Sequence, residues 1–278
     1  MSTPDDTAVC CPKSLPEDRQ LESARTAVEI NPANHPHLRP AIKFLGAGTV
    51  TKQLIAALAG KYWRSGGVHL AVRFLDTRDT ALKNHILAHM NAWSPGANVQ
   101  FSESHSADAE VRIARTPGGG YWSYLGTDIL HIDPDQPTMN LDSFSLTTSE
   151  NEYRRVVRHE TGHTLGFPHE HLRRDIVARI DPDKAIRYFA QLAGWDEATT
   201  RAQVLTPLEE TALLATPTDN QSIMCYQLPA RIMRDGRGVP GGLDINDRDH
   251  HFAHDLYPTA LVTAPSARPA AAANPAAR

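Results

Sequence analysis

The sequence predicts a single α+β domain in which a twisted sheet precedes a long helix and a less regular lower half. Three observations predict this class. Residues 68–75 alternate in polarity like a strand, residues 82–93 carry apolar side chains at helical spacing, and residues 150–165 lie between helix-start and helix-end signals. Strands followed by helices in this order are typical of α+β domains.

The first strand and the first helix follow directly from the residue pattern. Apolar residues fill every second position of the strand, namely Val68, Leu70, Val72 and Phe74. Large apolar residues then recur one helical turn apart, namely Leu82, Ile86, Met90 and Trp93. Either Asp79 or Thr80 can cap this helix at its start. We expect further short strands at residues 99–101, 110–114 and 129–133.

The composition of the chain excludes several classes of protein. The chain has 278 residues, 41% of them hydrophobic, which is enough for a sizeable core. The net charge is −4, and the absence of a long basic block argues against a nucleic-acid partner. The longest apolar run, residues 54–59, is far shorter than the roughly 20 residues of a membrane-spanning helix. Three cysteines cannot form a disulfide framework.

The two ends of the chain differ from its middle. Residues 1–60 are rich in proline and charge, and we expect an extended N-terminal arm or a segment like a pro-segment. Residues 259–278 are mostly alanine and proline and predict a disordered tail. The first 18 residues lack the basic start and apolar stretch of a signal peptide. Localisation therefore stays open between specialised, non-classical secretion and an intracellular role.

The chemistry is concentrated at the end of the helix predicted over residues 150–165. There the sequence HETGHTLGFPH places histidines at 159, 163 and 169. His159 and His163, four residues apart, lie about 40° apart on the helix, so both imidazoles can reach one ion. His169 can join them only if the chain reverses, which Gly166 permits because it has no Cβ. Three histidines leave a fourth zinc position open for water.

Glu160 follows the first histidine and points in a different direction, so it is poorly placed as a ligand. Its carboxylate can instead lie beside a metal-bound water and act as a general base. The sequence therefore predicts a Zn²⁺-dependent hydrolase, with His159, His163 and His169 as ligands and Glu160 as base.

At these residues the chain resembles the metzincin metallopeptidases, and among them the astacins, whose pattern HExxHxxGFxHE matches residues 159–170. A second stretch, SIMCY at residues 222–226, resembles their Met-turn. The resemblance covers about residues 61–258. It implies a mostly parallel sheet, an irregular C-terminal subdomain and one metallopeptidase catalytic domain over 61–258. It also implies that Met224 forms an apolar floor beneath the metal and that Tyr226 takes part in catalysis.

Other family features carry over less completely. Astacins typically hold the catalytic domain with two disulfides, which the three cysteines here cannot reproduce. In activated astacins the residue at Glu170 pairs with a newly cut amino terminus, yet no processing site is identifiable near residue 60. We expect a protein or peptide substrate to bind extended along an edge strand within residues 121–132.

Two alternatives stay open at this point. Cys10 or Cys11 can either block the zinc position as a thiolate, as a cysteine does in the related matrixins, or be a solvated thiol of the arm. The whole site can belong to an active endopeptidase, to a zinc-containing binding or effector module, or to a hydrolase of other amides or esters. The presence of Glu160 and Tyr226 together favours the endopeptidase, because a site that no longer catalyses hydrolysis does not need its general base. The oligomeric state and the cleavage preference are not predicted.

Overall fold

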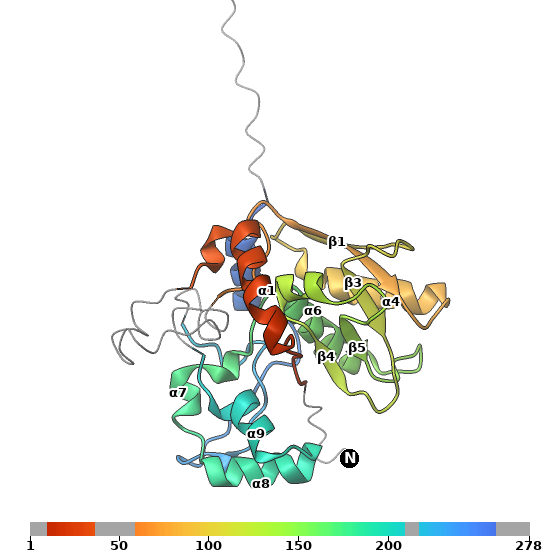
Figure 1. The fold of residues 1–278 in the computed structure, drawn as a ribbon. Helices are drawn as coiled ribbons and strands as arrows, with labels where there is room; N and C mark the ends of the chain where they lie inside the picture. Colours follow the sequence, from red (N-terminus) through yellow and green to blue (C-terminus); the bar gives the residue numbers. More distant parts are fainter. Residues whose placement is uncertain (1–9, 37–58, 209–216, 260–278) are drawn as a thin grey trace, which may run out of the picture.

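The protein is described here by a computed structural model that covers residues 10–36, 59–208 and 217–259 (Figure 1). The disordered tail expected over 259–278 lies, apart from its first residue, outside these described residues. Five strands form one sheet in the order β2-β1-β3-β5-β4. They are β1 (Val68–Phe74), β2 (Val99–Glu103), β3 (Val111–Ala114), β4 (Tyr121–Ser123) and β5 (Met139–Leu141). All neighbours are parallel except β4, which pairs antiparallel with β5 and forms one edge. This confirms the predicted α+β fold with a mostly parallel sheet.

The upper core forms where the sheet meets helix α4 (Thr80–Met90) and the long helix that carries the histidines. Every second residue of β1 from Val68 to Val72 is buried, as the alternating pattern predicts. The α4 helix begins at Asp79, whose carboxylate accepts hydrogen bonds from the amides of Ala81 and Leu82. Asp79, not Thr80, is therefore the cap.

The strand expected at residues 129–133 is wrong. These residues lie mostly in a 3₁₀-helix, η4 (Gly126–His131), and the missing strand is β5 (Met139–Leu141). The 3₁₀-helix begins at Gly126, whose positive φ of 46° turns the chain out of the extended conformation. A short apolar run cannot distinguish a strand from one buried helical turn. The edge strand expected within residues 121–132 is correspondingly short, because it ends with β4.

The lower half is irregular, as the sequence predicts. It contains α7 (Arg174–Val177), α8 (Pro182–Ala193), α9 (Glu197–Thr200) and the short turn η7 (Arg201–Leu205), below the sheet in Figure 1. These elements share a second core that includes Phe189, Val204 and Leu228. The last helix, α10 (Asp247–Leu256), returns to the upper core through Ala253 and Leu256. No helix in the described ranges is long and apolar enough to cross a membrane.

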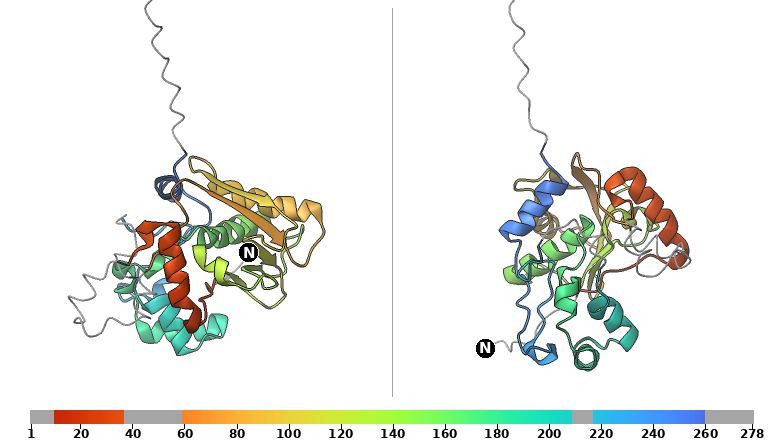
Figure 2. Two further views of the ribbon diagram at one scale, coloured as in Figure 1. Left: turned by 45° about the horizontal axis from the view of Figure 1, so that its top comes forward. Right: turned by 90° about the vertical axis from the view of Figure 1, so that its left-hand side faces the viewer.

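The N-terminal segment is more ordered than its composition predicts. Instead of being extended, residues 17–30 form helix α1 (Glu17–Ile30), which lies on the opposite side of the upper half from α10 (Figure 2). Its buried residues are small, namely Ser23, Ala24 and Ala27, so the helix packs closely without the large apolar side chains that sequence patterns reveal. Whether residues 1–60 form a separate functional unit remains a proposal.

A buried ionic cluster attaches α1 to the catalytic half. Lys61 lies 2.9 Å from Asp128 on η4, and the hydroxyl of Ser23 also donates to Asp128. The side chains of Lys61 and Asp128 are only 9% and 13% exposed. Removing one charge from such a pair leaves the other buried without compensation.

We therefore expect Asp128→Ala to lower the free energy of unfolding by about 3 kcal/mol. The matched variant Asp133→Ala breaks an exposed ion pair with Arg19 and is expected to cost about 0–1 kcal/mol. Urea denaturation of both variants measures the difference. Equal losses would contradict the assignment of Lys61 and Asp128 as a buried anchor.

Candidate metal centre and active site

The helix that carries the first two histidines is continuous from Glu150 to Thr164, as predicted. It consists of α5 (Glu150–Glu152), a π-helical turn η5 (Tyr153–Val157) and α6 (Arg158–Thr164). The hydroxyl of Ser149 caps its start by accepting from the amide of Glu152. The π-helical turn was not predicted, and such turns are frequent next to functional sites. Both His159 and His163 are buried on the last two turns.

A glycine-based turn ends the helix and reverses the chain. Gly166 has a φ of 95°, the amide of Phe167 bonds the carbonyl of Gly162, and the amide of Gly166 bonds that of His163. This pair of hydrogen bonds is the Schellman pattern. A Cβ at Gly166 would approach the carbonyl oxygen of Lys61 to 2.9 Å. The turn therefore requires glycine, as the motif predicts, and it directs residue 169 back toward the helix.

The structure brings the three predicted ligands together. The Nε2 atom of His169 lies 3.1 Å from that of His159 and 3.0 Å from that of His163. A tetrahedral zinc ion with bonds of about 2.0–2.1 Å would hold such atoms about 3.3 Å apart. The three nitrogens therefore converge to nearly the spacing that a single ion needs.

The hydrogen bonds of the two Nδ1 atoms determine which ring nitrogen of His159 and of His163 carries the proton. The Nδ1 of His159 lies 2.6 Å from the Ile223 carbonyl, and that of His163 lies 2.8 Å from the Phe167 carbonyl. A carbonyl only accepts, so each Nδ1 carries the proton and each Nε2 presents a lone pair. Burial lowers the pKa of His159 to about 4 and the pKa values of His163 and His169 well below their ordinary value. Two neutral imidazoles that present their lone pairs beside a third neutral imidazole are suited to bind a cation.

Glu160 lies beside the histidine cluster and is 1% exposed. Apart from the neighbouring Cys10 thiol, its carboxylate oxygens have no hydrogen-bond partner among the described residues. Burial raises its pKa to about 8, while the Cys10 thiol and the charge of Arg155 lower it. A buried carboxylate that makes no structural ion pair is available to exchange a proton with solvent or substrate.

The Met-turn packs directly against the active-site helix. A Cβ at Gly162 would come within 2.3 Å of the Met224 sulfur, so this glycine lets the methionine lie against the helix between the first two histidines. Asp249 of α10 holds the turn by accepting from the Ser222 hydroxyl at 2.5 Å and the Ile223 amide at 3.0 Å. Gly162 therefore leaves the space that the Met224 side chain occupies.

Tyr226 reaches the cluster from the other side of this turn. Its ring lies 4.3 Å from that of His169 and stacks at 4.0 Å on His171, a residue that the sequence reading missed. The Nδ1 of His171 accepts from the Tyr226 amide, and its Nε2 donates to the carbonyl of Gln203. His171 thus positions the tyrosine. No spacing rule marks such a supporting histidine, because it contacts a ring and backbone groups instead of an ion.

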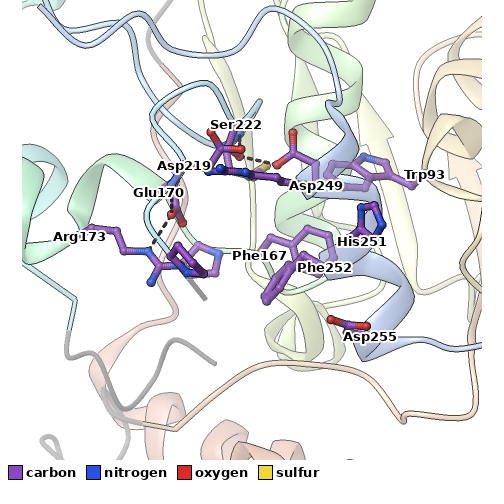
Figure 3. A pocket seen from close by; sticks show the side chains of 14 residues that line it. Trp93, Phe167, Glu170, Arg173, Asp219, Ser222, Asp249, His251, Phe252 and Asp255 are labelled. Carbon is purple, nitrogen blue, oxygen red and sulfur yellow. Dashed lines mark hydrogen bonds and ion pairs between the residues drawn. The ribbon is translucent and has the colours of Figure 1, made fainter. Parts of the chain in front are cut away.

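Glu170 follows the third histidine and lines a cavity of about 270 Å³ between α10 and the lower half (Figure 3). Its carboxylate lies 2.8 Å from the guanidinium of Arg173 and accepts from the amide of Asp219 at 2.9 Å. Burial raises its pKa, whereas the amide of Asp219 and the charge of Arg173 lower it. Glu170 is therefore already ion-paired in this form of the chain.

A second group of histidines does not form a comparable site. His85 and His89 of α4 lie 3.2 and 3.3 Å from the carboxylate of Glu150. Arg154 also faces Glu150, and Arg158 donates to the Nδ1 of His89. These positive charges disfavour a metal ion there, so we assign the group to a partly buried ion-pair network.

One of the three cysteines lies at the histidine cluster and another lies in the lower core. The Cys10 sulfur and the ligand nitrogens of the three histidines all lie within 4.8 Å of one another, and Cys10 is 5% exposed. The alternative in which Cys10 is a solvated thiol of the arm is therefore wrong. Cys225 is buried in the lower core, and all three cysteines are unpaired. From sequence, the proline-flanked pair at 10 and 11 was a weak signal, because nothing in it fixes a position 150 residues away.

Two helical histidines, a third returned by a glycine turn and a methionine turn beneath them define the metzincin class of zinc peptidases. The family model of the peptidase family described as "Astacin" matches residues 57–233. The chain belongs to the astacin family, whose metal is Zn²⁺.

Individual relatives agree with this family. A stretch of 93 residues is 37% identical to zinc metalloproteinase nas-27 of Caenorhabditis elegans, covering 34% of this chain and 19% of that protein. The match thus spans about a fifth of the curated relative. Among solved structures, one of myroilysin aligns with a TM-score of 0.67 and 28% identity, covering 72% of this chain and 97% of that one. A second myroilysin structure aligns with a TM-score of 0.54 and 28% identity, covering 71% and 86%.

The glycine turn offers a direct test of the metal centre. We expect Gly166→Ala to cost about 1–2 kcal/mol from its left-handed backbone, with a further penalty from the clash with Lys61. Zinc affinity should fall as well, because His169 is displaced. Gly194→Ala is the matched control, since Gly194 ends α8 with φ 67° and has open space around its Cβ position. Urea denaturation and competition with a zinc chelator measure both effects, and equal zinc affinity in the two variants would contradict the role of the turn.

Proposed function

We propose that this protein is a zinc-dependent endopeptidase that hydrolyses peptide bonds of protein substrates, with Glu160 as general base. The observation that carries this proposal is the buried carboxylate of Glu160 beside three converging imidazoles, where, among the described residues, it has no hydrogen-bond partner apart from the Cys10 thiol. A carboxylate kept in this state has no evident role in stability. Its position matches the need for a proton acceptor next to an activated water.

The residues that would hold the zinc ion are His159, His163 and His169. When bound there, zinc supplies a positive charge that makes a water more acidic and polarises a carbonyl group. The chain's own part begins with Glu160, which removes a proton from the attacking water and later delivers it to the leaving amine. Burial of this carboxylate keeps bulk water from competing for that proton.

Tyr226 is proposed to stabilise the negative charge that develops on the carbonyl oxygen of the substrate. Its hydroxyl donates a hydrogen bond to the backbone carbonyl of Cys10, which lies in the same cleft. The phenol thus reaches a peptide carbonyl located next to the histidine cluster. Met224 packs against the active-site helix and His171 stacks on the phenol ring, so both support the positions of these groups.

The edge strand β4 supports the proposed mode of substrate binding. The Tyr121 carbonyl accepts from the amide of Cys11 at 3.2 Å, and the Ser123 carbonyl accepts from the amide of Lys13 at 3.1 Å. An extended peptide can therefore pair with this edge by main-chain hydrogen bonds, as in β-strand addition. This pairing favours a peptide over a small ester or amide as substrate.

The alternative is a zinc-containing binding or effector module on the same fold. Both the base and the phenol are retained and lie beside the ligands, whereas a module without turnover needs neither of them. We therefore favour the endopeptidase.

We expect Glu160→Gln to lower peptide hydrolysis by roughly 10²–10⁴-fold while one zinc per chain is retained, because only the proton acceptor is removed. The measurement is cleavage of a peptide library by zinc-loaded full-length protein, before and after limited trypsin digestion. His159→Ala, which should lose zinc as well, is the control that separates the two roles. Undiminished cleavage by Glu160→Gln would remove the base assignment.

Tyr226→Phe is expected to lower kcat by roughly 10²-fold with little change in KM, because its hydroxyl acts when charge develops on the oxygen. The ring that stacks on His171 is kept, so zinc content should not change. Steady-state kinetics of the same preparations measure this split. A rise in KM alone would instead assign the tyrosine to ground-state binding.

A further inference from the structure

The edge strand β4 contacts the active-site helix through two buried hydroxyl groups. The Oγ atom of Ser123 lies 3.1 Å from the Oγ1 atom of Thr164. Ser123 is 0% exposed and Thr164 is 1% exposed. Ser123 is the last residue of β4 and Thr164 is the last residue of α6, and the two elements lie next to one another (Figure 1). We call this pair of side chains the hydroxyl bridge.

The protons of the two hydroxyl groups determine the direction of the bridge. The Ser123 hydroxyl donates to the carbonyl of Tyr124 at 2.9 Å, whereas the Thr164 hydroxyl lies 3.2 Å from the carbonyl of Glu160. Each hydroxyl has one proton to donate. The shorter backbone bond is kept when Thr164 donates to Ser123 and Ser123 donates to Tyr124. The hydrogen bonds then run from the helix, through the serine, to the backbone at the end of the strand.

The bridge joins a fixed helix end to a short strand. Thr164 directly follows the ligand His163, and its carbonyl accepts from the indole nitrogen of Trp63 at 2.8 Å. On the other side, β4 has only three residues, and the next amide, that of Tyr124, donates to the Thr138 carbonyl at 3.0 Å. So few backbone bonds hold β4 that a buried contact beneath it has a large effect on where it lies.

We propose that Thr164 and Ser123 are positioning residues that set the distance between a bound substrate peptide and the histidine ligands. This inference rests on the proposed peptidase function. In a strand the side chains stand perpendicular to the sheet, whereas the carbonyls lie in its plane. The Ser123 side chain therefore contacts the helix while its carbonyl stays at the outer edge, where it accepts a backbone amide in this structure. A peptide paired with that carbonyl is placed relative to His163 by the bridge.

The bridge acts through position and not through contact with the reacting atoms. Both hydroxyl groups are buried between the strand and the helix, on the side away from the outer edge. A displacement of about 1 Å between a bound substrate and its catalytic groups can lower the rate by roughly 10²-fold. Small shifts of β4 are therefore enough to change the rate.

A second threonine of the same helix provides a matched control. Thr161 is 0% exposed, and its hydroxyl donates to the carbonyl of Val157, four residues earlier, at 2.7 Å. Thr164 can make the corresponding bond to Glu160. Among the described residues, the Thr161 hydroxyl makes no hydrogen bond outside the helix, so it shares the burial and the local bond of Thr164 without the contact to β4.

The test uses zinc-loaded full-length wild type, Thr164→Val, Thr164→Ser and Thr161→Val, before and after limited trypsin digestion. We expect Thr164→Val, which keeps the shape but loses the hydroxyl, to lower kcat by roughly 10-fold with little change in KM. Thr164→Ser, which restores the hydroxyl, and Thr161→Val should stay within about 2-fold of wild type. Each of these proteins should retain one zinc ion per chain, because no ligand is changed.

Two further measurements keep the test independent of any one variant. Ser123→Ala removes the other hydroxyl and should lower kcat as Thr164→Val does, with no further loss when the two are combined, because both remove the same contact. Hydrogen exchange at the Tyr124 amide should be roughly 10-fold faster in Thr164→Val and less than about 2-fold faster in Thr161→Val. The exchange measurement does not require peptide hydrolysis.

The outcomes separate this inference from the proposed function. A kcat of Thr164→Val equal to that of wild type would overturn the positioning role. An equal loss in Thr164→Ser would assign the effect to the methyl group, and a loss of zinc from Thr164→Val would assign it to the metal centre, so either result would also overturn the role of the bridge. Faster exchange at Tyr124 in Thr164→Val, in a protein that cleaves no peptide, would uphold the bridge and reject the peptidase function instead.

Discussion

The structure depends on one constraint: in a buried site, the Nε2 atom of His169 lies 3.1 Å from that of His159 and 3.0 Å from that of His163, and both of these partners present lone pairs. Such lone pairs repel one another unless a cation lies between them. The chain maintains this arrangement by fixing each ring from outside. Backbone carbonyls hold the outer nitrogens of His159 and His163, and the Gly166 turn returns His169. The amide of Glu170 also bonds the Met224 carbonyl, which ties the returning loop to the Met-turn.

The same region shows how a catalytic domain of this family can be stable without disulfides. The indole nitrogen of Trp63 donates to the carbonyl of Thr164, and the phenol of Tyr257 donates to that of Leu165. The Trp63 amide in turn donates to the Tyr257 phenol. Residues from the beginning and the end of the catalytic half therefore meet at the last turn of the active-site helix. These bonds satisfy helix-end carbonyls that would otherwise be buried without partners, a cost of about 1–3 kcal/mol each.

Most of the site could be predicted from sequence because its ligands lie within eleven residues. His159 and His163 share a helix face, and the reversal to His169 is encoded by Gly166, so local geometry decides the outcome. The resemblance extended this to Met224 and Tyr226, which lie together in one short turn. The Zn²⁺ site was accessible for the same reason, whereas the mostly parallel sheet was expected only from the resemblance to the astacins.

What could not be predicted depends on contacts between distant segments. Nothing near Cys10 encodes its approach to a helix 150 residues away, because that approach accompanies the contact of α1 with η4. The docking face of α1 consists of Ser23, Ala24 and Ala27, whose small side chains leave no apolar periodicity. The 3₁₀-helix η4 and strand β5 were confused for a related reason. Ile129 and Met139 are both fully buried apolar residues in short segments, and only their neighbours determine which of them joins the sheet.

The N-terminal segment pairs with the same edge strand, β4, that we propose for an extended substrate peptide. Unpaired edge strands tend to aggregate, so proteins usually cover or interrupt them. Here residues 10–13 cover the edge with the chain's own backbone, while Trp122 provides a flat ring for the Lys13 stem. The carbonyls of Tyr121 and Ser123 thus have hydrogen-bond donors from the same chain, although they lie at the edge of the sheet. A substrate peptide that pairs with β4 would need the same carbonyls, so it would have to replace residues 10–13 at this edge.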